Sequence, residues 1–315
     1  MEEYPRTLSE LESRFSTETA CREYLIKLRW PEGTVCPRCG CRKMWATKRH
    51  LLNCADCGYQ ASVTAGTIFQ DTRKPLTLWF RAIWWVASQK TGASALGLQR
   101  VLGLGSYKTA WTWLHKLRRA MVRPGRDNLS GRVEVDEVFW GRPEEGLLGR
   151  ECEKKSLIAI AAEEDGAGIG RIRMKRIKDA SRDNLHAFIA ECVQPGSVIH
   201  TDGLFAYRGL EEIGFEHEVS TIIKKKQRAS ELLPRVHLVA SLLKRWLMGT
   251  HHGAISSEHL DYYLDEFTFR FNRRTSRSRG KLFYRLLQHA VAIDPAPYQT
   301  LVKHARGRKS VNHKI

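Results

Sequence analysis

The spacing of apolar residues changes along the chain, and the change separates helical stretches from β-rich ones. Apolar residues recur at helical spacing in residues 17–31 and again in residues 76–122, where glycine-containing breaks at 91–92 and 103–105 predict three short helices. From residue 132 the pattern is that of strands, in segments at 132–141, 155–165, 170–178 and 197–203. A helix is expected at 183–193, and a further helix at 207–214 followed by an edge strand at 215–220.

The order of these elements predicts a multidomain α/β protein. Three consecutive strands, then alternating helix and strand, then a helix-rich tail are typical of a ribonuclease-H-like α/β domain. Residues 125–130 have linker composition. We therefore expect an N-terminal helix and zinc ribbon at 1–70, a helical module at 71–124, a ribonuclease-H-like domain with C-terminal helices at 131–295, and a basic tail at 296–315.

Composition excludes several classes of protein. The 315 residues are 42% hydrophobic and 27% charged, which is typical of soluble globular proteins, and no apolar run is long enough to span a bilayer. The first residues are polar and acidic, without the apolar segment of a secretory signal. These features predict a cytoplasmic protein that does not insert into membranes.

The net charge is strongly positive, at +18 from 52 Lys and Arg against 34 Asp and Glu. Basic runs occur at 224–226, 270–279 and 303–309. A polyanion such as nucleic acid explains this excess best, because a surface selected only for solubility usually mixes both signs. An anionic membrane is a weaker alternative, since no basic amphipathic helix accompanies the charge.

Four of the eight cysteines form two CxxCG motifs, Cys36 with Cys39 and Cys54 with Cys57. Glycine after each pair permits the tight turn in which two sulfurs converge, and the 14 residues between the pairs read as a hairpin. Four thiolates at this spacing predict a closed tetrahedral Zn²⁺ site that stabilises a fold and does not catalyse. Disulfides and a thioredoxin-like redox pair are the alternatives, disfavoured by the compartment and by the presence of two facing pairs.

The three helices of the 71–124 module resemble a helix-turn-helix unit. Ser106 would begin the last helix, with Tyr107 and Lys108 exposed where a first turn could enter a DNA groove. Trp111 and Leu114 would pack inward. The alternative is a plain helical bundle whose basic residues lie on a solvated surface, and the pattern alone leaves both open.

Two aspartates are candidates for catalysis. Asp136 lies within the strand at 132–141, where alternation turns Glu134 and Asp136 to one face. Asp202 closes the strand at 197–203 and is followed by Gly203, a placement suited to the crevice where α/β sheets form sites. Two such carboxylates on neighbouring strands could hold two Mg²⁺ ions for phosphodiester chemistry. Taken alone, a strand aspartate is more often a turn or surface residue, and the pair in this context leaves both interpretations open.

Three motifs carry a family resemblance: DEVFWG at 136–141, HTDG at 200–203, and the long segment LKRWLMGTHHGAISSEHLDYYLDEFTFRFNRR at 243–274. With the zinc motif before them, they resemble the DDE-type insertion-sequence transposases related to the Merlin elements, from about residue 18 to 292. The resemblance implies binding to terminal inverted repeats, cleavage of DNA ends and joining of the freed 3′-OH to target DNA. It also implies Asp136 and Asp202 as the first two ligands of Mg²⁺ or Mn²⁺.

The family's third ligand, commonly Asn or Glu, precedes a Lys-Arg pair by seven residues. Counting back from Lys244 gives His237, which departs from that pattern. Imidazole can bind Mn²⁺ more readily than Mg²⁺ but adds no negative charge, so His237 could instead position a phosphate or water, or be a buried structural histidine. Seven residues are close to two helical turns, so Lys244 shares its face.

A Glu-Arg-Arg signature also belongs to the family. Glu266, Arg270 and Arg273 fall on one face of one helix. They either form a helix-stabilising ion pair or have Glu266 support the metal site while the arginines contact DNA phosphates. The loop 250–253 contains two further histidines that could contact DNA or metal.

The first hypothesis is therefore a DNA transposase that works on double-stranded transposon ends and target DNA, as a homo-oligomer of at least two copies because two ends must be joined. The second is a domesticated or inactive derivative that binds DNA without cutting it, a hypothesis that His237 keeps open. A related nuclease or recombinase without strand transfer is the third.

Overall fold

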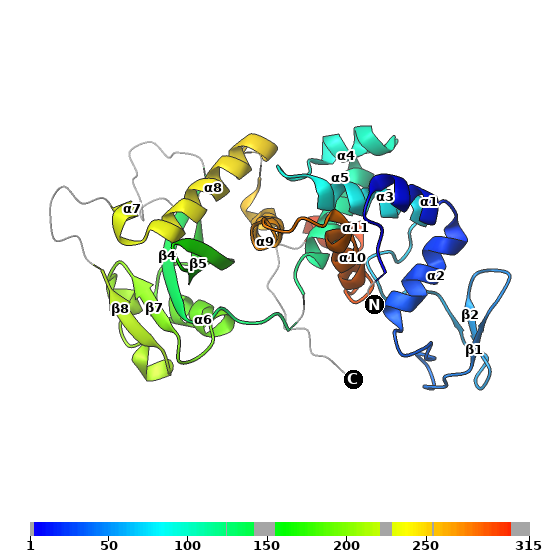
Figure 1. The fold of residues 1–315 in the computed structure, drawn as a ribbon, viewed down its shortest axis with the longest axis horizontal. Coiled ribbons are helices and arrows are strands. Elements are labelled where there is room, and N and C mark those ends of the chain that lie inside the picture. Colours follow the sequence, from blue (N-terminus) through cyan, green and yellow to red (C-terminus); the bar gives the residue numbers. More distant parts are fainter. Residues whose placement is uncertain (1–2, 124, 142–154, 221–228, 254, 304–315) are drawn as a thin grey trace. The chain divides into compact units, whose positions relative to one another are not determined.

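The computed structural model describes residues 3–123, 125–141, 155–220, 229–253 and 255–303 (Figure 1). The basic run at 224–226, Cys152 and most of the basic tail lie outside the described residues. Two compact units form, one from residues up to 123 together with 276–303, the other from residues 125–275. Among the described residues, no helix combines the length and apolarity needed to cross a bilayer.

The first unit contains a small ribbon and a group of helices. The ribbon strands are β1 (Met44–Ala46), β2 (Leu52–Cys54) and β3 (Gln60–Ala61), paired antiparallel in that order. The helices are α1 (Leu8–Arg14), α2 (Glu18–Arg29), α3 (Leu76–Ser88), α4 (Ala95–Leu102), α5 (Tyr107–Ala120), α10 (Arg279–Ala290) and α11 (Tyr298–Lys303). The hairpin and the three helices expected at 76–122 are present.

Helix α10 differs from the domain boundaries expected from the sequence. It packs against α3 and α5, so residues 276–303 belong to the first unit and not with the sheet. The fully buried Phe283 ring lies against Phe80 and Trp84 of α3, with centroids 5.7 and 5.8 Å away. The physical reason is that α3 is apolar nearly all round, and α10 supplies the apolar face that covers it.

Helix α5 is more deeply buried than either interpretation of the module expected. Arg118 is 2% exposed and donates to the Ala93 carbonyl oxygen at 3.4 Å, so it does not belong to a solvated basic surface. Ser106 precedes the helix as expected but makes no side-chain cap. Tyr107 is 53% exposed at the helix start, as expected.

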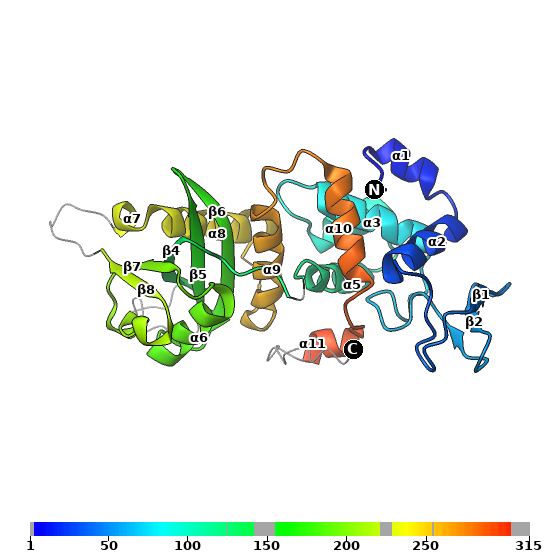
Figure 2. The ribbon, with the colours of Figure 1, turned by 60° about the horizontal axis from the view of Figure 1, so that its bottom comes forward.

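The second unit is a five-stranded mixed sheet between helices (Figure 2). Its strands are β4 (Arg132–Trp140), β5 (Ser156–Asp165), β6 (Gly168–Ile177), β7 (Val198–Thr201) and β8 (Glu216–Val219). Its helices are α6 (Arg182–Cys192), α7 (Ala229–Leu232), α8 (Pro234–His251) and α9 (Leu260–Phe271), with short 3₁₀ turns η2 (Phe205–Tyr207), η3 (Glu211–Ile213) and η4 (Ser257–His259).

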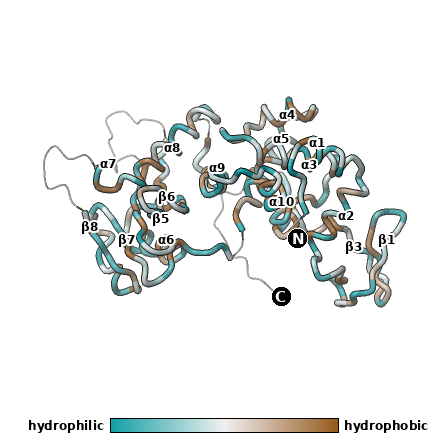
Figure 3. The backbone as a smooth tube through the Cα atoms, viewed as in Figure 1, coloured by the Kyte–Doolittle hydropathy of each residue, from teal (hydrophilic) through white to brown (hydrophobic). Residues whose placement is uncertain are grey.

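The strand order β6-β5-β4-β7-β8 confirms the ribonuclease-H-like fold. Strands β4, β5 and β6 pair antiparallel, β7 pairs parallel with β4, and β8 pairs parallel with β7. One sheet face packs on α6, and the other packs on α8 and α9. Figure 3 shows hydrophobic and hydrophilic residues interspersed along the helices, as a single buried face requires.

The prediction of a helix at 207–214 is wrong. The structure has two separate 3₁₀ turns there, η2 and η3. Gly209 and Gly214 have φ of +82° and +88°, in the left-handed region that ends a helical run. This interruption shapes the segment that follows Asp202.

Candidate functional site

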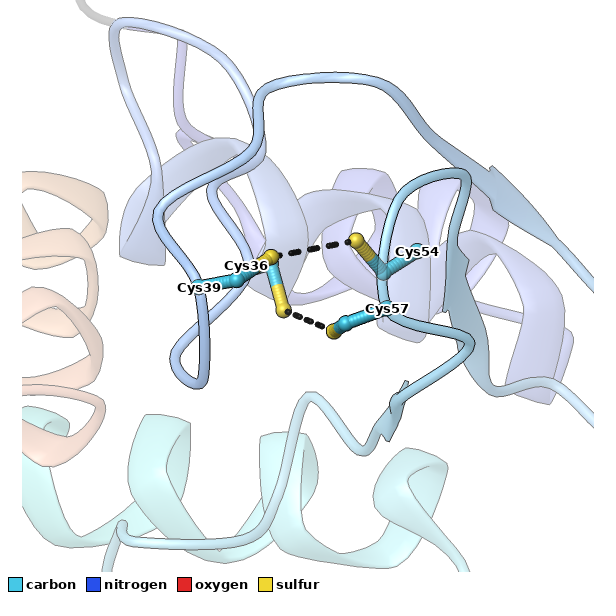
Figure 4. Close-up of side chains that lie close together, drawn as sticks. All are labelled: Cys36, Cys39, Cys54 and Cys57. Carbon is cyan, nitrogen blue, oxygen red and sulfur yellow. Dashed lines mark hydrogen bonds between the residues drawn. The ribbon is translucent and has the colours of Figure 1, made fainter.

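The four cysteines of the first unit converge on one point (Figure 4). Cys36 Sγ lies 3.7 Å from Cys57 Sγ, and Cys39 Sγ lies 3.5 Å from Cys54 Sγ. Four sulfurs around one Zn²⁺ are expected to lie about 3.8 Å apart, given Zn–S bonds of about 2.3 Å. The arrangement therefore fits a structural zinc ion held by four thiolates.

Local backbone geometry builds each half of this zinc site. Gly40 and Gly58 have φ of +75° and +66°, so each chain turns sharply after its CxxC pair. Backbone N–H groups of Cys57 and Asp56 donate to Cys54 Sγ and lower the pKa of this thiol to about 6. At Cys39 a backbone hydrogen bond from Cys41 lowers the pKa, but hydrogen bonds with the other three thiols outweigh it and raise the pKa to about 12. The zinc assignment therefore rests on the geometry of the four sulfurs.

The remaining described cysteines lie outside this cluster. Cys41 Sγ accepts from the Lys43 backbone at 3.4 Å. Cys21 and Cys192 are buried, and burial raises the pKa of each thiol to about 12. Cys21 and Cys192 therefore behave as small core residues.

In the second unit, parallel pairing brings the two candidate aspartates to the same level of the sheet. Strands β4 and β7 pair in register, with Val133 opposite Ile199 and Glu134 opposite His200. Two residues further, the same register leads to Asp136 on β4 and to Asp202 just beyond β7. Because neighbouring strands lie about 4.8 Å apart, Asp136 and Asp202 occupy adjacent positions at the carboxyl end of β7, in the interior of the sheet.

A tight turn fixes the backbone at Asp202. Its Oδ1 accepts from the Leu204 backbone N–H at 3.0 Å, and Gly203 has φ +84°. Tyr207 follows, fully buried, and donates from its hydroxyl to Glu137 Oε2 at 2.9 Å. Burial raises the pKa of Tyr207 well above its ordinary value, and the charges of Glu137, Asp136 and Asp202 raise it further, so the phenol stays neutral.

Helix α8 brings His237 to this region. Its Nε2 lies 3.6 Å from Asp136 Oδ2, and the two side chains are 31% and 18% exposed. Cis ligands of an octahedral Mg²⁺ ion are expected about 3 Å apart, so a small side-chain rotation would let both reach one ion. Asp136 and His237 thus offer a carboxylate and an imidazole side by side, and the strand register leads to the carboxylate of Asp202. The ligand atoms of the three do not all lie within 4.8 Å of one another in the described residues, so a Mg²⁺ or Mn²⁺ site here stays a prediction. Lys244 is exposed on the same helix.

A second acidic group in the same unit does not suit a metal. Ligand atoms of Glu134, Glu164 and His200 all lie within 4.8 Å of one another. However, Arg132 Nη1 lies 2.6 Å from Glu164 Oε1, and Arg235 Nη1 lies 2.9 Å from Glu134 Oε1. Two guanidinium groups already balance these carboxylates, and their charge would oppose a bound cation.

Glu266 and Arg270 lie on α9, which packs against strand β6, but Arg273 lies two residues beyond the end of this helix. The expectation that all three residues fall on one helix is therefore wrong for Arg273. Arg270 donates to Glu266 Oε1 from Nε at 2.9 Å and from Nη2 at 2.8 Å, with Glu266 fully buried. Arg273 lies over the Phe269 ring at 4.2 Å. The helix-stabilising ion pair is therefore present, and a role in supporting the metal or contacting phosphates stays a prediction.

The loop expected at 250–253 begins later than predicted, because Thr250 and His251 are the last residues of α8. His251 lies between the rings of Trp246 and Tyr263, each with its centroid 4.7 Å away. Its neighbour His252 adopts φ +51° at the end of α8. The packing of His251 is what a structural histidine shows.

Two known families match the segments of the chain that carry the two candidate sites. Residues 16–60 match the transposase zinc-ribbon domain, and residues 128–272 match the ISXO2-like transposase domain. Together the two matches cover more than half of the chain, in the order expected from the sequence. The chain belongs to the ISXO2-like insertion-sequence transposases. The predicted family and the predicted zinc ribbon are confirmed, and the relation to Merlin elements stays a prediction.

Other similarities accompany this family assignment. The ISXO2-like chain is 26% identical over 293 residues to an uncharacterized protein in transposable element ISH50 of Halobacterium salinarum, covering 85% of this chain and 94% of that protein. Among solved structures, a chain of the simian T-cell lymphotropic virus intasome in complex with PP2A regulatory subunit B56 gamma is 12% identical with a TM-score of 0.32, covering 65% of this chain and 71% of that one. A pre-cleavage Mos1 transpososome is 13% identical with a TM-score of 0.26, covering 71% and 81%.

Several residues that shape the site of this ISXO2-like transposase have no role that sequence reasoning alone assigns. Glu134 was placed on the same face as Asp136, but its partner on α8 lies about 100 positions away in the sequence, as the 101-residue separation of Arg235 and Glu134 shows. Tyr207 was assigned to a helix that does not form. The signal available for Glu134 was its position, as a charged residue within a strand, two residues before the candidate ligand Asp136.

Proposed function

We propose that this chain is a DNA transposase that binds terminal inverted repeats, cleaves DNA ends and joins the 3′-OH to target DNA. The observations that support the proposal are the 3.6 Å approach of His237 to Asp136 and the β4–β7 register that leads to Asp202, both within the matched transposase domain. The carboxylates of Asp136 and Asp202 come from adjacent strands, and the imidazole of His237 comes from helix α8. Together they would form a donor set for divalent metal-dependent phosphoryl transfer. When bound, Mg²⁺ or Mn²⁺ would activate the attacking oxygen and stabilise the leaving one.

The residues of the chain have distinct tasks in this proposal. Asp136 and Asp202 hold the metal, and His237 either completes the ligand set or orients a phosphate or water. Lys244 lies two turns further along α8, where its ammonium group can meet the DNA backbone. Arg270 and Arg273 are candidates for further phosphate contacts.

Double-stranded DNA is the proposed partner. The net charge of +18 supports a polyanion, and each phosphate that a Lys or Arg neutralises releases counterions and strengthens binding. The zinc ribbon and the helices α3 to α5 are proposed to select the transposon ends. Because two ends must be brought together, we propose a homo-oligomer on DNA that acts in the cytoplasm.

The second candidate function is a DNA-binding derivative without strand transfer. His237 favours it, because a neutral imidazole at the third position weakens the charge that holds a divalent ion. The transposase and the DNA-binding derivative would bind the same DNA. They differ only in whether cleaved and joined DNA products form.

One assay separates them. Purified protein is incubated with end-labelled terminal-repeat DNA and supercoiled target DNA in Mg²⁺ or Mn²⁺, and products are resolved on denaturing gels. The transposase should yield nicked ends and joined products that need both the repeat and the metal. Specific binding without either product in both metals would establish the DNA-binding derivative instead, and cleavage without joining would identify a nuclease.

A further inference from the structure

Glu134 lies two residues before Asp136 on β4, and its side chain is completely buried. Its Oε2 accepts hydrogen bonds from the backbone N–H groups of Arg235 at 2.7 Å and Val236 at 2.8 Å. Its Oε1 accepts a third from Arg235 Nη1 at 2.9 Å. Both backbone donors belong to the first turn of α8.

The N-terminus of helix α8 has no side-chain cap at its N-cap position. The first N–H groups of any helix lack partners within it. Leu233 stands at the N-cap position, where it offers no side-chain acceptor, and Pro234 has no N–H. A carboxylate from the sheet therefore supplies the missing acceptor, and its negative charge also interacts favourably with the helix dipole.

This arrangement ties the helix to the strand that carries the first candidate ligand. His237 is the residue directly after Val236, and its imidazole faces Asp136, two residues beyond Glu134 on β4. Resting on the proposed function, we propose that Glu134 is a positioning residue that sets the distance between His237 and Asp136 by fixing the first turn of α8. It acts through His237 and touches neither DNA nor metal.

The alternative is that Glu134 only stabilises the fold. A double-mutant cycle separates the two, because a residue that acts through His237 has no effect on catalysis once His237 is gone. The variants are Glu134→Gln, His237→Ala and their combination, assayed for end cleavage in Mn²⁺ at a temperature where each is shown to be folded by circular dichroism. Glu134→Gln should lower kcat by about 10- to 100-fold with little change in KM for DNA, as is typical for partners of metal ligands.

The double variant should cleave at the rate of His237→Ala within about twofold. Rate losses that multiply in the double variant, or a wild-type kcat in Glu134→Gln, would overturn the inference.

Glu163 is a matched control on the neighbouring strand. Its buried carboxylate also pairs with an arginine, Arg171, at 2.5 Å and accepts the backbone N–H of Ser130 at 2.9 Å, but these partners are outside α8. Glu163→Gln should lower stability and leave kcat within about twofold of wild type. If it lowers kcat as much as Glu134→Gln does, a general loss of stability explains both and the inference fails.

Two further measurements keep the test decisive. If Glu134→Gln does not fold, Glu134→Asp retains the charge while withdrawing the carboxylate by one methylene, and the same cycle is run with it. If the wild-type protein cleaves no DNA, the proposed function fails, and the cycle is repeated on Mn²⁺ affinity, measured by electron paramagnetic resonance of the zinc-loaded full chain. Equal weakening in both single variants with no further loss in the double supports positioning, and equal affinities in all four proteins would overturn it.

Discussion

The two candidate metal sites of this chain are assembled in different ways. The four cysteines of the ribbon lie within 22 residues of sequence, between Cys36 and Cys57, and each pair is shaped by its own turn. Asp136, Asp202 and His237 come from a strand, a turn and a helix spread over about 100 positions. Within β1 to β3 only Leu52, Cys54 and Ala61 are buried, whereas the sheet packs a large apolar core on each face. We therefore expect metal loss to unfold the first site and to leave the second folded.

Removal of a zinc ligand should have the largest effect. Cys54→Ser breaks the four-thiolate set, and a structural zinc contributes about 10–16 kcal/mol to the folding of small zinc domains. We expect loss of bound zinc, an unfolded ribbon and weaker binding to DNA ends, with the sheet intact. Zinc content by atomic absorption and amide NMR spectra measure both parts.

Cys41→Ser is the control, because Cys41 is near the motif but outside the cluster. It should retain one zinc ion. A folded ribbon in zinc-free Cys54→Ser would contradict the comparison between the two sites.

Loss of Asp136 should abolish chemistry without unfolding. Asp136→Asn keeps the shape of the side chain but removes the charge that holds the metal, so cleavage and joining should fall by about 10³-fold or more. Gel assays of products and a filter-binding titration of DNA measure the two effects separately. The exposed Asp183→Asn on α6 is the control and should retain activity. Activity that persists in Asp136→Asn would show that the metal is held elsewhere.

Replacing His237 by Glu should increase the affinity of the second site for Mg²⁺. The added negative charge beside Asp136 should reduce the Mg²⁺ concentration needed for half-maximal cleavage by about tenfold, since ligand charge sets affinity for hard cations. His237→Gln adds no charge and serves as the control. A rate that falls in both variants at unchanged metal dependence would assign His237 to phosphate or water and not to metal.

The smallest effect concerns pH and the stability of the sheet. Burial alone would raise the pKa of Glu163, but hydrogen bonds from the Arg171 side chain and from the backbone of Arg171 and Ser130 outweigh it and lower the pKa below 4.5. Because the folded-state pKa is lowered, the ionised carboxylate stabilises the fold above its ordinary pKa, and this contribution is lost as pH falls through the lowered value. Wild type should therefore lose more stability on acidification than Glu163→Gln.

Urea unfolding followed by circular dichroism at several pH values below 6 checks this difference. Glu212→Gln is the control, since its ion pair with Arg182 is exposed, with side-chain fractions of 50% and 72%. A wild-type pH dependence in Glu163→Gln would contradict the role of this pair.

Much of the fold could be predicted because its signals are local. Alternation of apolar residues located β4 to β7, and glycine-separated helical spacing located α3 to α5. The prediction of a helix at 207–214 was wrong because two glycines with positive φ interrupt a weak helical pattern. Helix α10 was expected with the sheet, since spacing reveals an apolar face but not which surface will cover it.

By itself, the sequence determined the zinc site, because its ligands are near neighbours and short turns fix their geometry. It also determined the candidate aspartates, through strand alternation and the family motifs. Only the tertiary structure decided that a parallel register brings Asp136 level with Asp202, that α8 turns His237 toward Asp136, and that Glu134 caps this helix. These contacts join residues up to about 100 positions apart, and the packing of helices on a sheet, which no local pattern encodes, is what brings them together.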